Sequence, residues 1–516
     1  MAAEHRTTTE RAAAWLLPGL GHVLWIAVFL GALADGPRMM NGDGDLGRHI
    51  TIGNHILDTG SIPTRDVFSF TRFGDELTPH EWLSQVAFAA SHRALGSDGP
   101  VLLTALIIAT AFLLVLRRTR LAGARVVLAL AVSALAAATS AVHWLTRPHV
   151  FTFLFLAAWL VALDRLRDEP RRGWWLLPLI MVVWVNAHGA FIAGFVTWAL
   201  YGAGLAWDRY WDADAPAPAP GLARLFLLAG AASFVISFAN PAGYGLWETS
   251  VGYVGNRYLV DITAEYHSPN FHVTSFWPFA AMIGMLVLAL ALHRGRLRGE
   301  HALPAGAWLL MALYSGRNIP LFAIVAAPAL GSALAGWLSA HAARARLIPA
   351  WWSLEDRVAT TDGRARGALW PVAVLLLAVG GYRAGASLSF DGRPNGFDPQ
   401  RFPVAAVEWM EAERVGGNGF NYFTWGGYLL YRTWPERRVF IDGQTDFYGE
   451  ALTREYGTVI AAEDGWQEVL ARYGVQWILV PQGEALHRTI RSAPDWRLLY
   501  QDSTAVLYTV AGAALP

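Results

Sequence analysis

Apolar residues gather into long runs over most of this chain, and short polar stretches separate the runs. A helix that crosses a bilayer needs about 20 mostly apolar residues, so the shorter runs must extend into their flanking residues. The pattern predicts a polytopic α-helical membrane protein with about 11 transmembrane helices. The runs are Ala12–Ala34, Gly99–Leu116, Val126–Val142, Val150–Leu163, Trp174–Val185, Phe191–Trp207, Leu222–Phe238, Phe276–Leu292, Ala302–Tyr314, Ile319–Leu338 and Ala368–Val379.

The pattern changes after about Gly381, where helix-like and strand-like stretches alternate. Two stretches have helical spacing, namely Pro403–Arg414 and Glu463–Gly474. Strand-like stretches are the apolar runs Arg437–Gly443 and Val475–Pro481 and the tail Arg497–Val510, which resembles a strand pair. We therefore predict a membrane domain over residues 1–385, with a first external loop at 35–98, and a C-terminal extracytoplasmic α/β domain over 386–516.

Composition supports the membrane assignment and excludes several other classes. Of 516 residues, 54% are hydrophobic and 16% are charged, and the mean hydropathy is +0.32. The net charge of zero provides no global basic field, so we predict no nucleic-acid partner. The chain contains no cysteine, which excludes disulfides and cysteine-ligated metals. The first apolar run lacks a small-residue cleavage site and is predicted to be a retained helix.

The distribution of arginine predicts the orientation, because the chain has no lysine. Four arginine-rich connections fall on one side if the helices alternate, and the positive-inside rule places them in the cytoplasm. They are Arg117–Arg125, Asp164–Arg172, His293–Glu300 and His341–Gly367. The N-terminus is then cytoplasmic, and the first loop and C-terminal domain are outside. This assumes a hairpin turning at Asn186–Gly189, since one long helix over Trp174–Trp207 would reverse everything downstream.

Most candidate chemistry lies in the loop Asn41–Trp82, which opens with the acidic pair Asp43 and Asp45. Two carboxylates one residue apart can bind a cation or accept a proton if they line a cavity. The alternative is a plain turn, because Asp and Gly are turn formers. A connector of about 40 residues that is dense in ionisable groups is more often functional than idle. Its further candidates are Arg48, His49, Asp66, His80 and Glu81, and their spacing matches no zinc-protease motif.

The first helix, the loop opening N-G-D-G-D, the many spans and the external α/β domain together resemble the GT-C superfamily of integral-membrane glycosyltransferases. That superfamily includes protein mannosyltransferases, aminoarabinose transferases of lipid A and oligosaccharyltransferases. The sequence lacks the WWD signature of the oligosaccharyltransferases, which argues against that branch. The resemblance implies a sugar donor on a polyprenyl phosphate, a lipid, glycan or protein acceptor, and a location in a bacterial inner membrane.

The resemblance also implies roles for particular residues. Asp43 takes the place of the superfamily's first-loop acid, with Asp45 as its rival, and the implied role is a general base in a displacement that inverts the anomeric carbon. The same acids would ligate a divalent cation, Mg or Mn, if one is used. Candidate phosphate ligands on the outer side are Arg147, with His149 beside it, Arg257 and Arg317. The alternative for each arginine is interfacial snorkelling or helix capping.

Two stretches of the C-terminal domain combine aromatic and polar residues, Phe420–Tyr431 and Phe440–Gly449. Their rings could stack on sugars, and Asp442, Gln444 and Asp446 could bind hydroxyl groups. The alternative is a core strand that ends in a glycine turn, with the aromatic rings at the membrane interface.

Three other functions stay open from the sequence. A lipid-glycan flippase or transporter would need ionisable residues inside the spans, which here are nearly free of acids. A surface-polysaccharide polymerase or ligase would use a later external loop, and Asn240–Ser275 is the candidate. A scaffold without catalytic activity would share the same architecture.

Overall fold

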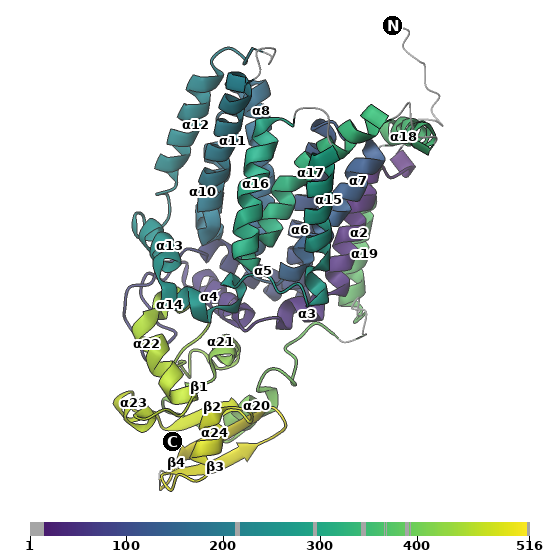
Figure 1. Ribbon diagram of the computed structural model, residues 1–516. Coiled ribbons are helices and arrows are strands. Elements are labelled where there is room, and N and C mark those ends of the chain that lie inside the picture. Colours follow the sequence, from purple (N-terminus) through teal and green to yellow (C-terminus); the bar gives the residue numbers. More distant parts are fainter. Residues whose placement is uncertain are drawn as a thin grey trace.

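The computed structural model describes residues 15–211, 217–292, 297–341, 347–365, 369–386 and 394–512, with the single residues 367 and 392. A bundle of long helices stands on a small mixed domain formed by the C-terminal part of the chain (Figure 1). The helices of the bundle are α2 (Leu20–Ala34), α6 (Asp98–Leu121), α7 (Val126–Ser140), α8 (His149–Asp168), α10 (Leu176–Ala187), α11 (Ile192–Trp211), α12 (Leu222–Ile236), α15 (Trp277–Leu292), α16 (Gly299–Tyr314), α17 (Ile319–His341) and α19 (Leu369–Arg383).

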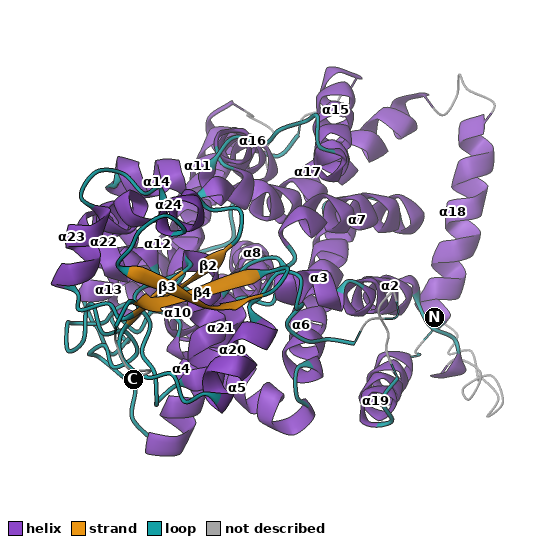
Figure 2. Cartoon of the chain, turned by 90° about the horizontal axis from the view of Figure 1, so that it is seen from below, coloured by secondary structure: helices purple, strands orange, loops and turns teal. Residues whose placement is uncertain are grey.

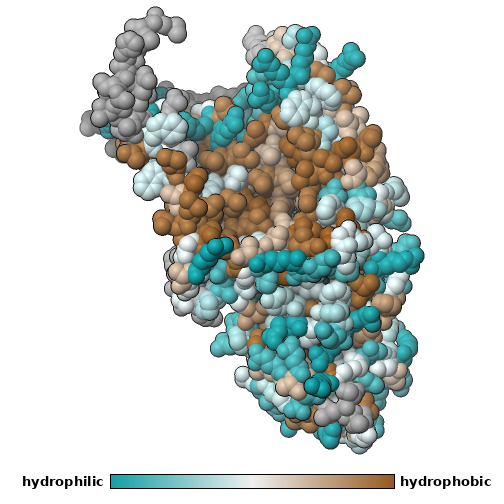
Figure 3. All heavy atoms as spheres, turned by 180° about the vertical axis from the view of Figure 1, so that it is seen from behind, coloured by the Kyte–Doolittle hydropathy of each residue, from teal (hydrophilic) through white to brown (hydrophobic). Residues whose placement is uncertain are grey.

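Where its residues are described, every predicted apolar run overlaps one of these helices, whereas Ala12–Ala14 and Ala368 of the predicted runs lie outside the described part of the chain. The number of about eleven membrane spans is not confirmed. Within the described residues, six helices are long and apolar enough to cross a membrane, or seven if the bent pair α18 (Leu347–Arg364) and α19 counts as one span. The other helices are too short, because a helix rises about 1.5 Å per residue and a 12-residue helix such as α10 spans only about 18 Å. On the face of the molecule shown in Figure 3, a belt of apolar side chains covers the bundle between two polar ends.

The helical conformation is interrupted between α10 and α11, as the predicted hairpin requires. His188 is extended at the end of α10, and the short helix η2 (Gly189–Phe191) follows it. Gly204 of α11 lies against Gly299 at the start of α16, where a Cβ on Gly299 would be 2.4 Å from the Gly204 carbonyl oxygen. Glu300 beside it contacts Arg167 of α8, so α11 returns to the end of the bundle from which α10 starts. Trp184 of α10 donates a hydrogen bond to Thr152 of α8. His188 is thereby held at the same end of the bundle as the C-terminal domain.

A network of buried ionic groups ties helices together at the other, arginine-rich end. Arg118 of α6 contacts Asp164 of α8 at 2.6 Å, and the Tyr201 hydroxyl of α11 donates to the same carboxylate at 3.0 Å. Arg167 of α8 also contacts Glu300 of α16 at 2.9 Å. Four helices are therefore joined there by charge-assisted bonds, which are the stronger class of hydrogen bond.

Helix α18 lies at the edge of the bundle at this same end, beside α2 and α7 (Figure 2). It makes an angle of 73° with α19, and Figures 1 and 2 both place it far from the C-terminal sheet. Glu355 accepts hydrogen bonds from the backbone N–H groups of Val127 and Leu128, at the start of α7. Asp362 accepts one from Leu20, at the start of α2. The first N–H groups of a helix have no partner within it, so these two carboxylates act as caps for α7 and α2.

The C-terminal domain contains a four-stranded sheet in the order β1-β2-β4-β3. Strand β1 (Gly419–Asn421) is parallel to β2 (Trp477–Pro481), and β4 (Ala505–Val510) is antiparallel to both β2 and β3 (Trp496–Gln501). The helices of this domain are α20 (Val404–Ala412), α21 (Gly426–Thr433), α22 (Thr445–Ile460), α23 (Trp466–Arg472) and α24 (Ala485–Ile490). The predicted helices, the strand at Val475–Pro481 and the terminal strand pair are confirmed.

The prediction of a strand at Arg437–Gly443 is wrong. This segment is extended, but it stays outside the sheet and makes one isolated parallel bridge, between Val439 and Ser69 of the first loop. Asn421 explains its position, because the side chain accepts a hydrogen bond from the Phe440 N–H and donates one to the Ile441 carbonyl. The segment therefore links the first loop to the sheet.

The first loop is itself largely helical and supports the C-terminal domain. Its helices are α3 (Gly36–Asn41), α4 (Asp45–Thr59) and α5 (Trp82–Leu95). Glycines allow α4 and α21 to touch through their backbones, because a Cβ on Gly47 would lie 2.3 Å from the Gly427 carbonyl oxygen and one on Gly44 would lie 1.8 Å from that of Thr424. This close contact positions the start of α4 against the C-terminal domain.

Candidate functional site

Asp43 and Asp45 lie at the turn that joins α3 to α4, and both carboxylates contact one guanidinium. The Asp43 side chain accepts a hydrogen bond from the Asp45 N–H at 3.0 Å, as in a plain Asx turn. Arg147, just before α8, places its Nη1 3.0 Å from Asp43 and its Nη2 2.8 Å from Asp45. Asp43 and Asp45 thus form a turn and also provide the two carboxylates that bind Arg147.

Glu265 extends this arrangement toward a second arginine. Its carboxylate lies 3.6 Å from Arg147, 3.5 Å from Arg317 and 3.2 Å from His143. The Arg317 guanidinium also stacks over the Tyr266 ring, 4.4 Å from its centre. We call Asp43, Asp45, Arg147, Glu265 and Arg317 the acid–arginine cluster. It joins the first loop, the segment before α8, the short helix η3 (Ala264–Tyr266) and the segment before α17.

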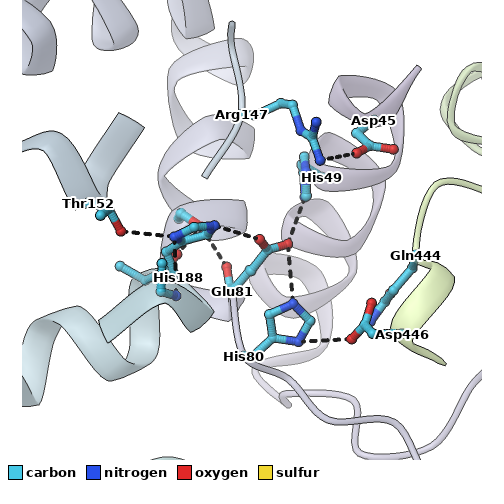
Figure 4. Close-up of polar contacts among 12 residues, drawn as sticks. Asp45, His49, His80, Glu81, Arg147, Thr152, His188, Gln444 and Asp446 are labelled. Atoms are coloured by element: carbon cyan, nitrogen blue, oxygen red, sulfur yellow. Dashed lines mark hydrogen bonds and ion pairs between the residues drawn. The ribbon is translucent and has the colours of Figure 1, made fainter. Parts of the chain in front are cut away.

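A second group of ionisable side chains surrounds Glu81, at the start of α5 (Figure 4). The nitrogen atoms of Arg48, His49, His80 and His188 each lie 3.8 Å from a Glu81 carboxylate oxygen. We call these five residues the Glu81 cluster. Thr152 of α8 fixes His188 through a 2.9 Å hydrogen bond. His49 follows Asp45 by one turn of α4, so one helix contributes to both clusters.

The C-terminal domain closes over the Glu81 cluster. Arg48 donates a 2.9 Å hydrogen bond to Gln444 and lies 3.7 Å from Asp442. His80 lies 3.7 Å from Asp446. Asp442 belongs to the extended segment at Arg437–Gly443, and Gln444 and Asp446 follow it directly, so the position of this segment outside the sheet brings all three partners to the site.

Burial changes the acid–base properties of several of these groups. Burial raises the pKa of Asp43 to about 6, in opposition to Arg147, which lowers it, while the charge of Asp45 raises it further. Burial likewise raises the pKa of Asp442 to about 6 against the effect of Arg48. For Glu265, burial alone would raise the pKa, but Arg317 and Arg147 hold it well below its usual value. Asp43 therefore has a pKa close to neutral pH, whereas Glu265 stays ionised. Two neighbouring acids with such different pKa values are typical of proton-transfer sites.

The structure gathers most, but not all, of the residues predicted from the sequence. Asp43, Asp45, Arg48, His49, His80, Glu81, Arg147, Arg317 and Asp442 lie in the two clusters or in contact with them. His149 lies beside them, with its Nε2 2.8 Å from the His143 carbonyl oxygen. Asp66 instead accepts bonds from the Ser69 hydroxyl and the Phe68 N–H within a buried turn. Arg257 is 94% exposed, pairs with Asp261 four residues on and stays outside the site.

Sequence reasoning missed the roles of His143, Glu265 and His188. From the sequence, His188 could equally be a hydrogen-bonded packing residue, and Glu265 lies in the loop Asn240–Ser275 that a polymerase would use. The available signal is the placement of polar residues in connections predicted on the same side as the first loop. No local motif marks these residues, because their ionic partners come from other elements that lie far away along the chain.

The donor set does not fit a Mg or Mn ion in its present arrangement. Asp43 and Asp45 both contact the Arg147 guanidinium, so each carboxylate already has a cationic partner. Among the residues that the structure describes, no group of three or more His, Asp and Glu side chains is arranged to hold a metal ion. Arginine thus supplies the positive charge that neutralises the two acids.

A cleft of about 420 Å³ lies between the turn that joins α3 to α4 and the C-terminal domain. Asp43 belongs to its lining, whereas the other members of the acid–arginine cluster do not. Most of the lining residues have either a polar, uncharged side chain or an aromatic ring. They are Asn41, Gly42, Asp43, Gln400, Arg401, Phe402, Tyr422, Thr424, Trp425, Pro481, Gln482, Gly483, Ser503 and Thr504.

Comparison with protein-family models gives no match, and a search of curated protein sequences gives none either. Solved structures do match. An archaeal oligosaccharyltransferase, AglB from Archaeoglobus fulgidus, in complex with an inhibitory peptide and a dolichol-phosphate, aligns with 89% of this chain and 69% of its own, at 15% identity and a TM-score of 0.56. ArnT from Cupriavidus metallidurans bound to undecaprenyl phosphate aligns with 96% of this chain and 99% of its own, at 16% identity and a TM-score of 0.50. At these identities the likeness shows a shared fold.

Proposed function

Since the chain has the fold of GT-C membrane glycosyltransferases, we propose that it transfers a sugar from a polyprenyl-phosphate-linked donor to an acceptor, with inversion at the anomeric carbon. The observation that carries the proposal is the acid–arginine cluster, which combines a carboxylate of raised pKa with two arginines at one end of the apolar belt. A phosphate on a lipid needs cationic partners at the membrane boundary, and an acceptor hydroxyl needs a base.

In this proposal Asp43 is the general base. A base works best when its pKa lies close to the operating pH, and a value of about 6 meets that condition better than that of a solvated aspartate. Asp43 accepts the proton of the acceptor hydroxyl as the hydroxyl oxygen attacks the anomeric carbon and the bond to the lipid phosphate breaks. Asp45 stays paired with Arg147 and keeps the guanidinium in place.

Arg317 and Arg147 are the proposed phosphate ligands. In the structure the Glu265 carboxylate lies between them, 3.5 Å from Arg317 and 3.6 Å from Arg147. The two arginines therefore already bind one anion, and a phosphate oxygen would bind beside it. Leu310 and Tyr314, in the helix that precedes Arg317, have exposed side chains. A polyprenyl chain would lie along them, as apolar surface at membrane depth favours. The solved ArnT and AglB structures hold undecaprenyl phosphate and dolichol-phosphate, respectively.

The proposed location is a bacterial inner membrane, with the site on its outer face. The arginine-rich connections that contain Arg120, Arg125 and Arg167 lie at the end opposite the C-terminal domain, where α18 lies at the edge of the bundle. The positive-inside rule places that end in the cytoplasm. The buried ionic network there joins four helices, which disfavours the flippase alternative because alternating access requires that end to open.

The experiment that tests the function is turnover of polyprenyl-phosphate sugars by the purified chain in lipid nanodiscs. Asp43→Asn should lower donor hydrolysis and transfer at least about 100-fold, the lower range for removal of a general base. Asp58→Asn is the matched control, because Asp58 is exposed and contacts only the exposed Arg93. Full activity in both Asp43→Asn and Asp45→Asn would reject the assignment.

A further inference from the structure

The cleft beside Asp43 has a chemistry that the charged site does not share. Among its described lining residues, Asp43 and Arg401 are the ones that carry a full charge, and the two charges have opposite sign. The Arg401 Nη1 donates a hydrogen bond to the Asn41 carbonyl oxygen at 2.5 Å, which orients the guanidinium without neutralising it. The lining therefore has no excess charge of either sign, so an ion that leaves water to enter the cleft would find no net opposite charge to compensate its desolvation.

Hydroxyl and amide groups provide most of the polar lining instead. Gln400 and Ser503 are exposed there, while Thr424, Gln482 and Thr504 are half-buried. Such groups can both donate and accept hydrogen bonds, which suits ligands that present many hydroxyls. The Trp425 indole donates to the Arg401 carbonyl at 2.7 Å, so its position in the cleft wall is fixed.

The backbone around the cleft disfavours an extended peptide. Peptides that bind along a sheet usually pair with an open strand edge. Here the sheet contributes mainly turns: Pro481 ends β2, Gln482 and Gly483 follow it, and Ser503 and Thr504 connect β3 to β4. The edge strands of the sheet are β1 and β3, and no residue within β1 or β3 lines the cleft.

From these observations we infer that the cleft binds a neutral glycan, which delivers the acceptor hydroxyl to Asp43. The inference rests on the proposed function, and it adds the class of acceptor. Asp43 is the residue shared by the cleft and the acid–arginine cluster, so a hydroxyl entering from the cleft reaches the base, while the donor phosphate binds the arginines beyond it. The C-terminal domain then selects the acceptor, and the membrane domain holds the donor.

Ligand binding to the full-length protein in nanodiscs tests this inference. The probes are three neutral tetrasaccharides, built from glucose, mannose and galactose, with a tetragalacturonate and a Gly-Ser-Thr peptide for comparison, followed by saturation-transfer NMR. At least one neutral tetrasaccharide should bind, and Ser503→Tyr should weaken its binding about tenfold by filling the cleft. Ser492→Tyr, at another exposed turn that does not line the cleft, is the matched control.

Three outcomes would overturn the inference: no binding of any neutral tetrasaccharide, equal binding to Ser503→Tyr, or cleft-dependent binding of the peptide or the acidic glycan instead. Donor hydrolysis by the wild-type protein, with water as acceptor, is measured in parallel. If a donor is hydrolysed but the glycans do not bind, the acceptor class is wrong and the proposed function stands. If no donor is turned over, the proposed function fails whatever the glycans do.

Discussion

At the scale of single residues, Asp43 is subject to opposing influences. Burial and the charge of Asp45 favour its protonated form, and Arg147 favours the carboxylate. The balance leaves the pKa of Asp43 at about 6, so the proposed base is ionised at neutral pH without being as weak a base as a free aspartate.

The first prediction concerns pH. Donor turnover should fall about tenfold per pH unit below about pH 6, because only the ionised Asp43 accepts a proton. A profile of kcat/KM between pH 4.5 and 8 measures this. Asp43→Asn should leave a residual rate that no longer shows this acidic limb, and an unchanged limb in that variant would assign it to another group.

The same shift affects stability with a definite sign. A folded-state pKa raised above the ordinary value of 3.8 contributes stability that is fully present below pH 3.8 and is lost as the pH rises through about 6. Asp43→Asn should therefore be more stable than the wild type at pH 8, by about 3 kcal/mol at most, and the difference should vanish at low pH. Thermal unfolding of both proteins at pH 4 and pH 8 measures it, and a difference of opposite sign would contradict it.

Two arginines that the sequence could not distinguish offer a matched pair. Arg317 stacks on Tyr266 beside Glu265, whereas Arg257 is almost fully exposed. Arg317→Ala should raise the KM for the lipid-linked donor roughly 10- to 100-fold, through loss of charge-assisted hydrogen bonds of about 1.5–3 kcal/mol. Arg257→Ala should leave the KM unchanged. Equal effects of the two substitutions would remove Arg317 from the phosphate site.

At the scale of elements, the contact between α4 and α21 holds the site together. The motif N-G-D-G-D-L-G had suggested a turn, and the turn is present, but Gly44 and Gly47 also allow backbone contact with a helix nearly 400 residues away. Sequence patterns predicted α20, α23 and the terminal strand pair, because each of these has its own periodicity. They failed for Arg437–Gly443, since its partners are the first loop and Asn421 rather than a neighbouring strand.

The contact leads to a prediction about glycine. Gly47→Ala should destabilise the protein by about 1–3 kcal/mol, because the new Cβ would lie 2.3 Å from the Gly427 carbonyl oxygen and the helices must separate. Gly457→Ala in α22 is the control, since a Cβ there meets no atom within 4 Å. That substitution should stabilise by about 0.5–1 kcal/mol through helix propensity. Thermal unfolding in nanodiscs distinguishes them, and similar melting temperatures would argue against a tight α4–α21 contact.

At the scale of the whole molecule, the apolar runs predicted the helices well because burial in a bilayer demands long apolar segments. The predicted number of about 11 spans is not confirmed, since helices such as α10 and α16 are by themselves shorter than a bilayer. The site was predicted in part. The first loop is dense in ionisable residues, whereas His143, His188 and Glu265 become meaningful only once the bundle brings its connections together.

Orientation can be tested directly because the chain has no cysteine. Ser492→Cys in the C-terminal domain should react with a membrane-impermeant maleimide added to intact cells, since we place that domain outside. Thr360→Cys, exposed on α18, should react only after the membrane is opened. The reverse pattern of labelling would place the C-terminal domain in the cytoplasm.

The capping of α2 and α7 by α18 has a consequence for how the protein is made. Asp362 lies 342 residues after Leu20, and Glu355 lies 228 residues after Val127, so both caps are synthesised long after the helices that they complete. At about 5–20 residues per second, a ribosome reaches α18 about 10–50 s after α7. Until then the first N–H groups of both early helices must bind water or lipid headgroups. Nascent chains arrested before α18 should therefore show α2 and α7 inserted but frayed at these ends, and release of the chain should protect their amides from hydrogen exchange.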